Sequence, residues 1–186
     1  MSDITMQEIR DVYARAERIY SQEDIDAAYD RLANVITQSL ENRNPLVISV
    51  MVGGLIPAGQ LLPRLDFPLQ MDYLHATRYH GSTQGGELHW LVRPSHSLQD
   101  RVVLLIDDIL DEGVTLAAIC AACRQAGARE VYTAVLLNKL HSRKSGFEAD
   151  FVGLDVEDRY VFGCGMDYKD YLRNVPGIYA IPDEMK

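Results

Sequence analysis

The sequence has 186 residues and a formal net charge of −9 at pH 7, enough chain for one sizeable core and a field that repels polyanions. Nucleic acid and anionic membrane surfaces are therefore not expected as partners. The three cysteines are an odd and sparse set, which excludes a disulfide scaffold. The sequence has no apolar run long enough to cross a bilayer, and its N-terminus is charged, so we expect a cytoplasmic protein.

The first forty residues are predicted to be mostly helical. Apolar side chains recur at helical spacing over 5–20 and again over 23–41. Between these stretches, Ser21 and Asp24 have the spacing of a capping box, in which each side chain satisfies a backbone N–H of the other residue. We therefore expect two helices that meet at Ser21.

Short apolar runs and helical segments alternate in the rest of the chain. Strands are expected at 46–52, 70–79, 88–94, from 102 onward and at 129–140, with two short ones within 147–168. Helices are expected from about Pro57 and over Val114–Ala126, the second ending at Gly127. The polar, glycine-rich stretch 80–87 is predicted to be a mobile linker, and a turn of helix is predicted at 168–173.

Strands that alternate with helices predict an α/β fold, with a mostly parallel central sheet flanked by helices on both faces. In such sheets, the loops after the carboxyl ends of the strands form the binding crevice. The buried strand that starts at Val102 runs into a cluster of acids at such an end. We therefore expect a functional site there.

The stretch VVLLIDDILDEGVTLAAI (102–119) has features of a phosphate and sugar site. Gly113 permits a sharp turn, and the amides that open the next helix carry partial positive charge that suits a phosphate. Thr115 adds a hydroxyl donor. Asp107 and Asp108 can accept from sugar hydroxyls or from metal-bound waters, and Asp111 lies where a base would reach an atom attached to the sugar.

The segment LLIDDILDEGVTL (104–116) resembles the signature of the type I phosphoribosyltransferases, which bind phosphoribosyl pyrophosphate (PRPP). The resemblance covers roughly 45–175, and within the family the chain is similar to members that act on hypoxanthine and guanine. It implies one domain, 1–186, with a core at 44–175. A small hood formed by the terminal segments would include N-terminal helices from 1–43, with a tail at 176–186.

The resemblance also implies a reaction. The 5-phosphoribosyl group of PRPP would be transferred to N9 of a 6-oxopurine, hypoxanthine or guanine, giving IMP or GMP and pyrophosphate. Mg²⁺ would be the cofactor, held by Asp107, Asp108 and Asp167 mostly through ligand and water. The family further implies a homodimer or homotetramer.

Matching positions imply roles at the sugar end of the site. Asp107 and Asp108 would hold the ribose 2′- and 3′-hydroxyls, and Asp111 would be the catalytic base near purine N7. Arg173 would face pyrophosphate. The remaining residues of the PRPP and phosphate site would be Glu112, Gly113, Val114 and Thr115 in one loop, and Gly53 and Gly54 in another.

Matching positions also imply how the purine is recognised. Lys139 would donate to the 6-oxo group, Tyr160 would stack on the base and Val161 would read its edge through the backbone. Asp167 would lie near the exocyclic position. A lysine ammonium has only donors, so Lys139 favours a carbonyl over an amino group and hence 6-oxopurines over adenine. Arg78 and Tyr79 would begin a loop that closes over the site.

Three positions depart from the family pattern. The first loop has no cation beside Gly53, Val114 removes a common cation, and Glu112 occupies a position where a small hydroxyl residue is usual. Two like charges about 5 Å apart repel by roughly 3 kcal/mol at an effective dielectric near 20. We therefore expect the Glu112 carboxylate to point away from a bound phosphate.

The cysteines and histidines predict no further site, and a second class of protein is not favoured. Cys120 and Cys123 lie in a predicted helix without a second ligand pair, so packing is favoured over metal binding. The histidines His75, His80, His89, His96 and His141 show no metal-binding spacing and have no assigned role. A phospho-receiver domain would have its acid pair near the N-terminus, whereas about a hundred residues precede the acid pair of this chain.

A regulatory protein of the same fold that senses PRPP or a purine nucleotide stays open as an alternative. Asp111, Lys139 and Tyr160 favour the enzyme, because a pure PRPP sensor has less need of residues that read a purine. Xanthine or another 6-oxopurine also stays open as the base.

Overall fold

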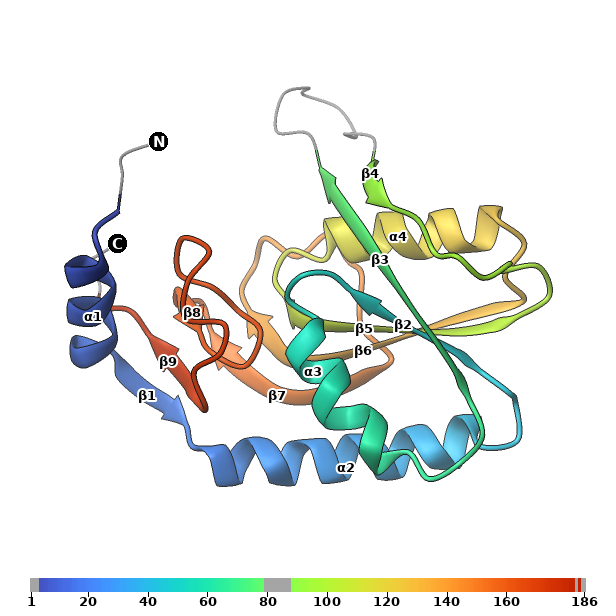
Figure 1. Ribbon diagram of the computed structural model, residues 1–186, viewed down its shortest axis with the longest axis horizontal. Helices are drawn as coiled ribbons and strands as arrows, with labels where there is room; N and C mark the ends of the chain where they lie inside the picture. Colours follow the sequence, from blue (N-terminus) through green and yellow to red (C-terminus); the bar gives the residue numbers. More distant parts are fainter. Residues whose placement is uncertain (1–3, 79–87, 183, 185–186) are drawn as a thin grey trace.

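The computed structural model describes residues 4–78, 88–182 and 184. Its largest element is a six-stranded sheet with the strand order β4-β3-β2-β5-β6-β7 (Figure 1). The strands are β2 (Leu46–Val50), β3 (Gln70–Arg78), β4 (Leu88–Val92), β5 (Val102–Leu110), β6 (Glu130–Leu140) and β7 (Phe151–Glu157). Only β4 runs antiparallel to its neighbour, so the predicted, mostly parallel sheet is confirmed.

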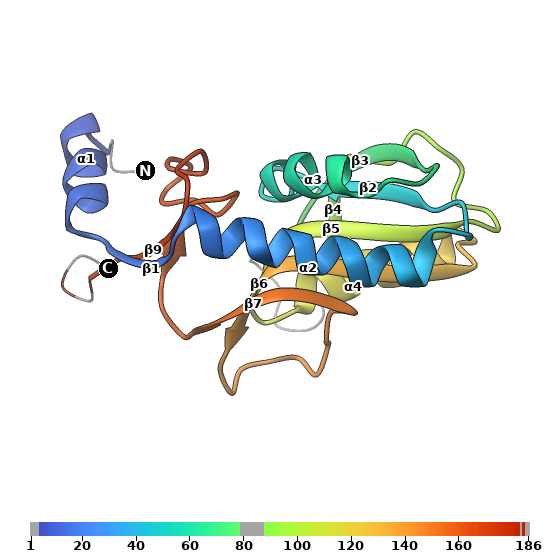
Figure 2. The same ribbon diagram turned by 90° about the horizontal axis from the view of Figure 1, so that it is seen from below.

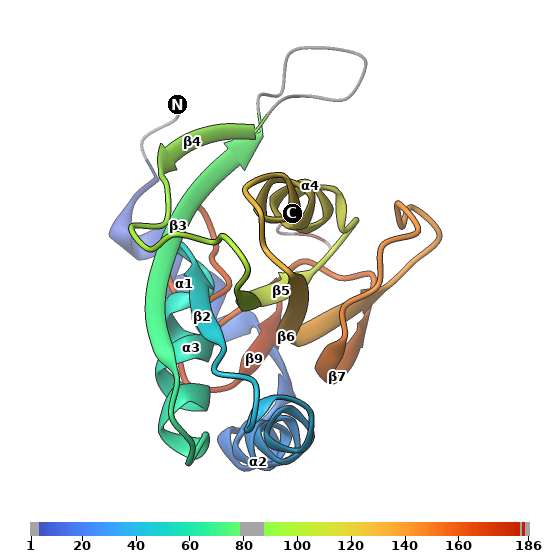
Figure 3. The ribbon, with the colours of Figure 1, turned by 90° about the vertical axis from the view of Figure 1, so that its right-hand side faces the viewer.

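Helices cover both faces of this sheet. They are α2 (Gln22–Leu40), α3 (Leu55–Leu61), followed by the 3₁₀ turn η1 (Leu62–Arg64), and α4 (Val114–Gln125). Figure 3 shows α2 and α3 on one face and α4 on the other. The Ser21–Asp24 capping box is present at the start of α2, as predicted.

The central strand β5 is buried on both sides, and its alternate side chains enter two different cores. Leu104 and Ile106 pack into the cluster under α2 and α3, whereas Val103 and Leu105 pack into the cluster under α4. This explains why the sequence is a continuous apolar run over this strand and not an alternating one. The acids begin where the continuous apolar run ends.

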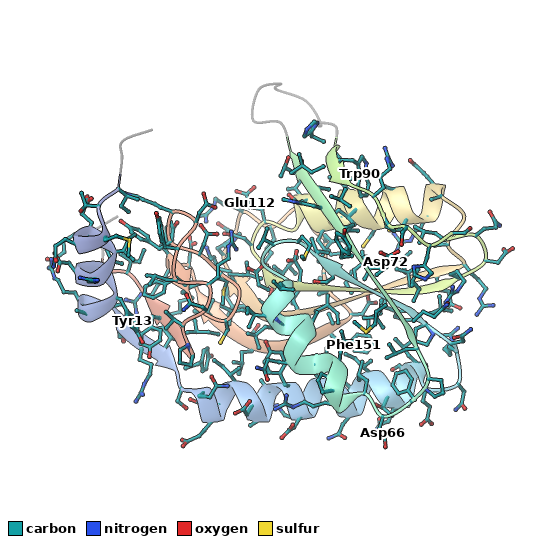
Figure 4. All side chains as sticks on the ribbon, viewed as in Figure 1. Tyr13, Asp66, Asp72, Trp90, Glu112 and Phe151 are labelled. Atoms are coloured by element: carbon teal, nitrogen blue, oxygen red, sulfur yellow. The ribbon has the colours of Figure 1, made fainter. Side chains whose placement is uncertain are left out.

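A second, smaller sheet with the strand order β1-β9-β8 lies beside the carboxyl ends of the core strands (Figures 1 and 2). We call this part the hood. It contains α1 (Met6–Arg15), β1 (Glu17–Tyr20), β8 (Val161–Phe162) and β9 (Ile178–Ala180). Tyr13 of α1 packs edge to face on the rings of Phe162 and Tyr179 and so fixes the helix on the sheet (Figure 4).

The prediction of one helix over 5–20 was wrong in its second part. The helix ends at Arg15, and residues 17–20 form β1, which pairs with β9. The predicted irregular tail therefore also contains a strand. The pairing partner lies about 160 residues away along the sequence, so local periodicity could not reveal it.

The second N-terminal helix, α2, packs against the core sheet through side chains such as Tyr29, Leu32 and Ile36, and the same cluster includes hood side chains such as Val161 and Ile178. One further prediction needs correction. The predicted helical turn at 168–173 is absent because Lys169, Asp170 and Leu172 have positive φ, which a right-handed helix excludes.

Cys120 and Cys123 are free and buried in the core under α4, as predicted. Burial raises the pKa of the Cys120 thiol to about 12 and that of Cys123 to about 11, so both stay uncharged. Within the described residues, no helix combines the length and the apolar character that spanning a bilayer requires.

Candidate active site

The turn between β5 and α4 has the geometry expected from its glycine. Gly113 adopts φ +82°, a left-handed conformation, and α4 begins at the next residue, Val114. The N–H groups in the first turn of a helix have no intrahelical acceptor, and here they open toward a pocket lined by Gly113, Val114 and Thr115. This helix start is therefore available to an anion.

This pocket, which we call pocket A, has a volume of about 710 Å³. It brings together segments that are far apart in the sequence: the end of β5, the start of α4, the end of β3 and the loops of the hood. Its lining includes Gly53, Thr77, Asp107, Asp108, Asp111, Glu112, Gly113, Val114, Thr115, Arg143, Asp167 and Arg173. The carboxylates and the helix start thus face the same cavity.

The two adjacent acids of β5, Asp107 and Asp108, accept hydrogen bonds from the backbone. The Asp107 carboxylate accepts from the Asp108 N–H at 3.0 Å, and that of Asp108 accepts from the Ile109 N–H at 2.8 Å. Burial, followed by the charge of its neighbour, raises the pKa of Asp107 well above its ordinary value. Burial also raises the pKa of Asp108. Donors or cations that enter pocket A would therefore favour the charged form of both carboxyl groups.

The first glycine of the loop after β2 makes room for Asp108. A Cβ added at Gly53 would overlap the Asp108 carboxylate, and one at Gly54 would overlap the carbonyls of Val50 and Ile106. The peptide bond before this pair, Met51–Val52, is cis. Both glycines are therefore required by close approach within the protein.

Arg173 and Asp167 lie opposite these acids, on the loop that follows β8. Arg173 Nη2 is 2.6 Å from Asp167 Oδ1, and its Nη1 donates to the Gly165 carbonyl at 2.7 Å. The same Nη1 is 4.0 Å from Asp108 Oδ2. Arg173 is thus the cation on the hood side of pocket A, and its charge lowers the pKa of both β5 acids against the effect of burial.

A second cavity, pocket B, adjoins the first and has a volume of about 220 Å³. Its walls combine an aromatic ring, a lysine and apolar side chains. The lining residues are Asp108, Ile109, Asp111, Lys139, Tyr160, Val161, Met166 and Asp167. Tyr160 is 42% exposed, so its ring is available to a flat ligand, and it packs edge to face on Tyr168.

The site contains an interaction that the sequence did not reveal. Lys139 Nζ lies 2.7 Å from Asp111 Oδ2, and Nε2 of His141 lies 2.6 Å from Asp111 Oδ1. Burial would raise the pKa of Asp111, but hydrogen bonds from Lys139 and His141 outweigh it and lower the pKa. His141 follows β6 directly, two residues after Lys139, and no sequence motif marks it, so only the fold shows that it reaches Asp111.

Arg143 is the second residue that sequence reasoning missed. Its guanidinium donates two hydrogen bonds to the Asp158 carboxylate, at 2.7 and 3.0 Å, and its Nε is 3.9 Å from Glu112 Oε1. Figure 4 shows Glu112 beside the start of α4. The Glu112 side chain is 53% exposed and faces Arg143, which adds a cation at the rim of pocket A.

Two predicted site features fall partly or wholly outside the described residues. Arg78 ends β3, but its side chain, Tyr79 and the predicted linker 80–87 are not described. The predicted loop closure therefore stays a prediction. Among the described residues, no three histidine, cysteine, aspartate or glutamate side chains lie where they would jointly hold a metal ion.

A helix N-terminus and the acidic end of a strand share one pocket at the carboxyl edge of a parallel sheet. This arrangement defines an α/β protein of the sugar-phosphate- and nucleotide-binding class. Comparison with known proteins narrows this class. The model of the phosphoribosyl transferase domain matches residues 15–170, and the chain belongs to that family.

Relatives cover nearly the whole chain. A hypoxanthine-guanine phosphoribosyltransferase of Staphylococcus epidermidis is 31% identical, over 90% of this chain and 94% of its own. One of Bacillus subtilis is 34% identical, over 86% and 89%. The crystal structure of a hypoxanthine phosphoribosyltransferase from Staphylococcus aureus superposes with a TM-score of 0.86 at 27% identity, covering 98% of both chains.

Proposed function

We propose that this protein transfers the 5-phosphoribosyl group of PRPP to N9 of a 6-oxopurine, giving a nucleoside 5′-monophosphate and pyrophosphate in purine salvage. The names of its relatives support this reaction. One geometric observation supports it most directly. Pockets A and B share four lining residues, Asp108, Ile109, Asp111 and Asp167, so a ligand can occupy both across this junction.

The sugar phosphate fits pocket A. The amides of Gly113, Val114 and Thr115 suit the 5′-phosphate, because a helix N-terminus offers free donors and a positive dipole end. Asp107 and Asp108 suit the two ribose hydroxyls, whose donors would favour the charged carboxylates against burial. Gly53 lines the pocket beside them, and Arg173 faces the same pocket with a positive charge suited to pyrophosphate.

The purine fits pocket B. Tyr160 offers a face for stacking, and Ile109 offers an apolar contact from β5. Lys139 offers only donors, which suits a 6-oxo group, and Asp111 next to it can accept the proton on N7, the atom beside that group on the purine edge. Val161 and Asp167 border the rest of the pocket. This arrangement favours hypoxanthine, guanine or xanthine over adenine.

The proposed reaction replaces one bond at C1′ of the ribose by another. The N9 lone pair forms the bond to C1′ of the ribose, while the bond from C1′ to pyrophosphate breaks and its electron pair leaves with pyrophosphate. The proton on N7 passes to Asp111, and the N–H electron pair returns to the purine ring. Positive charge builds on the ribose during this exchange, and Asp107 and Asp108 stabilise it.

Mg²⁺ is the proposed cofactor. The donor set fits a hard cation, because Asp107, Asp108 and Asp167 offer carboxylate oxygens around the junction of the two pockets. The lack of a three-ligand cage among the described residues also fits, since Mg²⁺ keeps several waters and binds through substrate phosphates. When bound, the ion neutralises the charge on the leaving pyrophosphate.

We also propose that copies of the chain associate in the cytoplasm as a dimer or tetramer. An exposed apolar surface between α3 and β3 supports association, since isolated monomers rarely expose such patches. Its members are Leu55 at 50% exposure, Met71 at 59% and Tyr73 at 50%, which line one groove. Light scattering after gel filtration tests this. A monomer at micromolar concentration contradicts it.

A spectrophotometric assay tests the proposed reaction. The purified protein is mixed with PRPP, Mg²⁺ and, in turn, hypoxanthine, guanine, xanthine and adenine. Turnover is expected with at least one 6-oxopurine and not with adenine. No turnover with any base, despite PRPP binding by calorimetry, would favour the regulatory alternative of the same fold.

A further inference from the structure

His141 lies directly after β6 and contacts the proposed catalytic base. Its side chain is only 3% exposed, and its Nε2 is 2.6 Å from Asp111 Oδ1. Lys139 holds the other oxygen, Oδ2, at 2.7 Å. The Asp111 carboxylate therefore has two different partners, one on each oxygen.

The second ring nitrogen of His141 fixes its tautomer. The backbone N–H of Arg143 donates to His141 Nδ1 at 3.1 Å. A ring nitrogen that accepts a hydrogen bond carries no proton, so the single ring proton is on Nε2 and the imidazole is neutral. His141 is thus a neutral donor, aimed at Asp111 by a backbone contact.

The two partners of Asp111 differ in what happens when a purine binds. Lys139 is the proposed donor to the purine 6-oxo group. When that group accepts the hydrogen bond from Lys139, Oδ2 of Asp111 loses its partner. His141 has no such competing acceptor among its described contacts, and its burial keeps it beside Oδ1. Without it, a carboxylate that is 45% exposed would be free to rotate.

We infer that His141 is a positioning residue for the base: it anchors Oδ1 of Asp111 so that Oδ2 faces purine N7 once Lys139 has turned to the 6-oxo group. This inference rests on the proposed function. The exchange also adjusts the proton affinity of the base. Hydrogen bonds from Lys139 and His141, together with the charge of Lys139, hold the pKa of Asp111 low against burial, so the departure of Lys139 raises this pKa toward that of a proton acceptor.

Two amide variants separate the donor role of His141 from its packing. The amide nitrogen of glutamine reaches the position of Nε2, whereas that of the shorter asparagine reaches only the position of Nδ1. His141→Gln therefore keeps a donor to Asp111, and His141→Asn loses it. The matched control is His96→Gln, because His96 also contacts a carboxylate, Asp72, at 2.9 Å, but lies outside both pockets.

The expected result is a selective loss of kcat. His141→Asn lowers kcat by about 10- to 100-fold, as does removal of a hydrogen-bond partner that orients a metal-binding side chain. Its KM for PRPP changes less than about twofold, because the phosphate contacts are intact. His141→Gln recovers most of the lost kcat, and His96→Gln behaves as the wild type.

The outcomes that overturn the inference are distinct. If the wild type turns over and kcat is unchanged in His141→Asn, only the role of His141 is refuted. An equal loss of kcat in both amide variants also refutes this role, because such a loss indicates an effect on packing. Absence of wild-type turnover with every 6-oxopurine overturns the reaction and this role together. Independent of any variant, ¹⁵N NMR of the wild-type ring must show a protonated Nε2, and a proton on Nδ1 instead refutes the geometry.

Discussion

Replacing Glu112 by glutamine removes a negative charge from the loop that precedes α4, where the 5′-phosphate is proposed to bind. The Glu112 side chain is 53% exposed, and Arg143 Nε lies 3.9 Å from its carboxylate. A matched change, Arg143→Gln, removes the cation that faces it. The two variants should shift phosphate affinity in opposite directions.

The size of the effect follows from the exposure of Glu112. At a separation of about 5 Å, one negative charge on the phosphate and one on Glu112 repel by roughly 3 kcal/mol at an effective dielectric of 20, but by under about 1 kcal/mol at the dielectric of water. A half-exposed carboxylate that faces an arginine lies near the lower value. Glu112→Gln should therefore lower the KM for PRPP by about two- to fivefold.

Steady-state kinetics at two ionic strengths measure this effect. The Debye length falls from about 10 Å at 0.1 M salt to about 3 Å at 1 M, so the gain from Glu112→Gln should shrink in high salt. Arg143→Gln should raise the KM for PRPP in low salt, and Glu23→Gln, an exposed change on α2, should alter neither value. A KM that rises or stays constant in Glu112→Gln at low salt refutes the reasoning.

Three further changes test other parts of the site and core. Asp111→Asn should lower kcat by about 100-fold or more while PRPP binding by calorimetry stays nearly intact, and an unchanged kcat would remove the base assignment. Gly53→Ala should displace the Asp108 carboxylate and raise the KM for PRPP at least tenfold; wild-type kinetics would contradict the close approach. Tyr29→Phe should leave the free energy of unfolding unchanged or raise it, because this buried hydroxyl has no hydrogen-bond partner among the described residues; a loss above about 1 kcal/mol in denaturant unfolding would contradict this.

The elements that could be predicted from the sequence have local signals. The apolar run of β5 has to be buried on both faces, and Gly113 has to turn the chain before α4 can begin, so this part of the site followed from the residues. The capping box of α2 is equally local. The family resemblance implied that Lys139, Tyr160 and Asp167 contact one purine, and in the structure these three residues line pocket B.

The features that were missed depend on contacts between distant segments. The strand β1 exists because residues 17–20 meet β9, about 160 residues away along the sequence. His141 carries no sequence motif, and only the fold shows that it reaches Asp111. Arg143 was overlooked for the same reason, although it supplies a cation near the position where Val114 lacks one.

A crystal structure of the protein with IMP tests the proposed site most directly. The phosphate should lie on the amides of Gly113 to Thr115, the ribose hydroxyls on Asp107 and Asp108, and the purine in pocket B between Tyr160 and Ile109. Lys139 should have left Asp111 for the 6-oxo group, with His141 still in place. A phosphate bound elsewhere, or a purine outside pocket B, would contradict the proposed function.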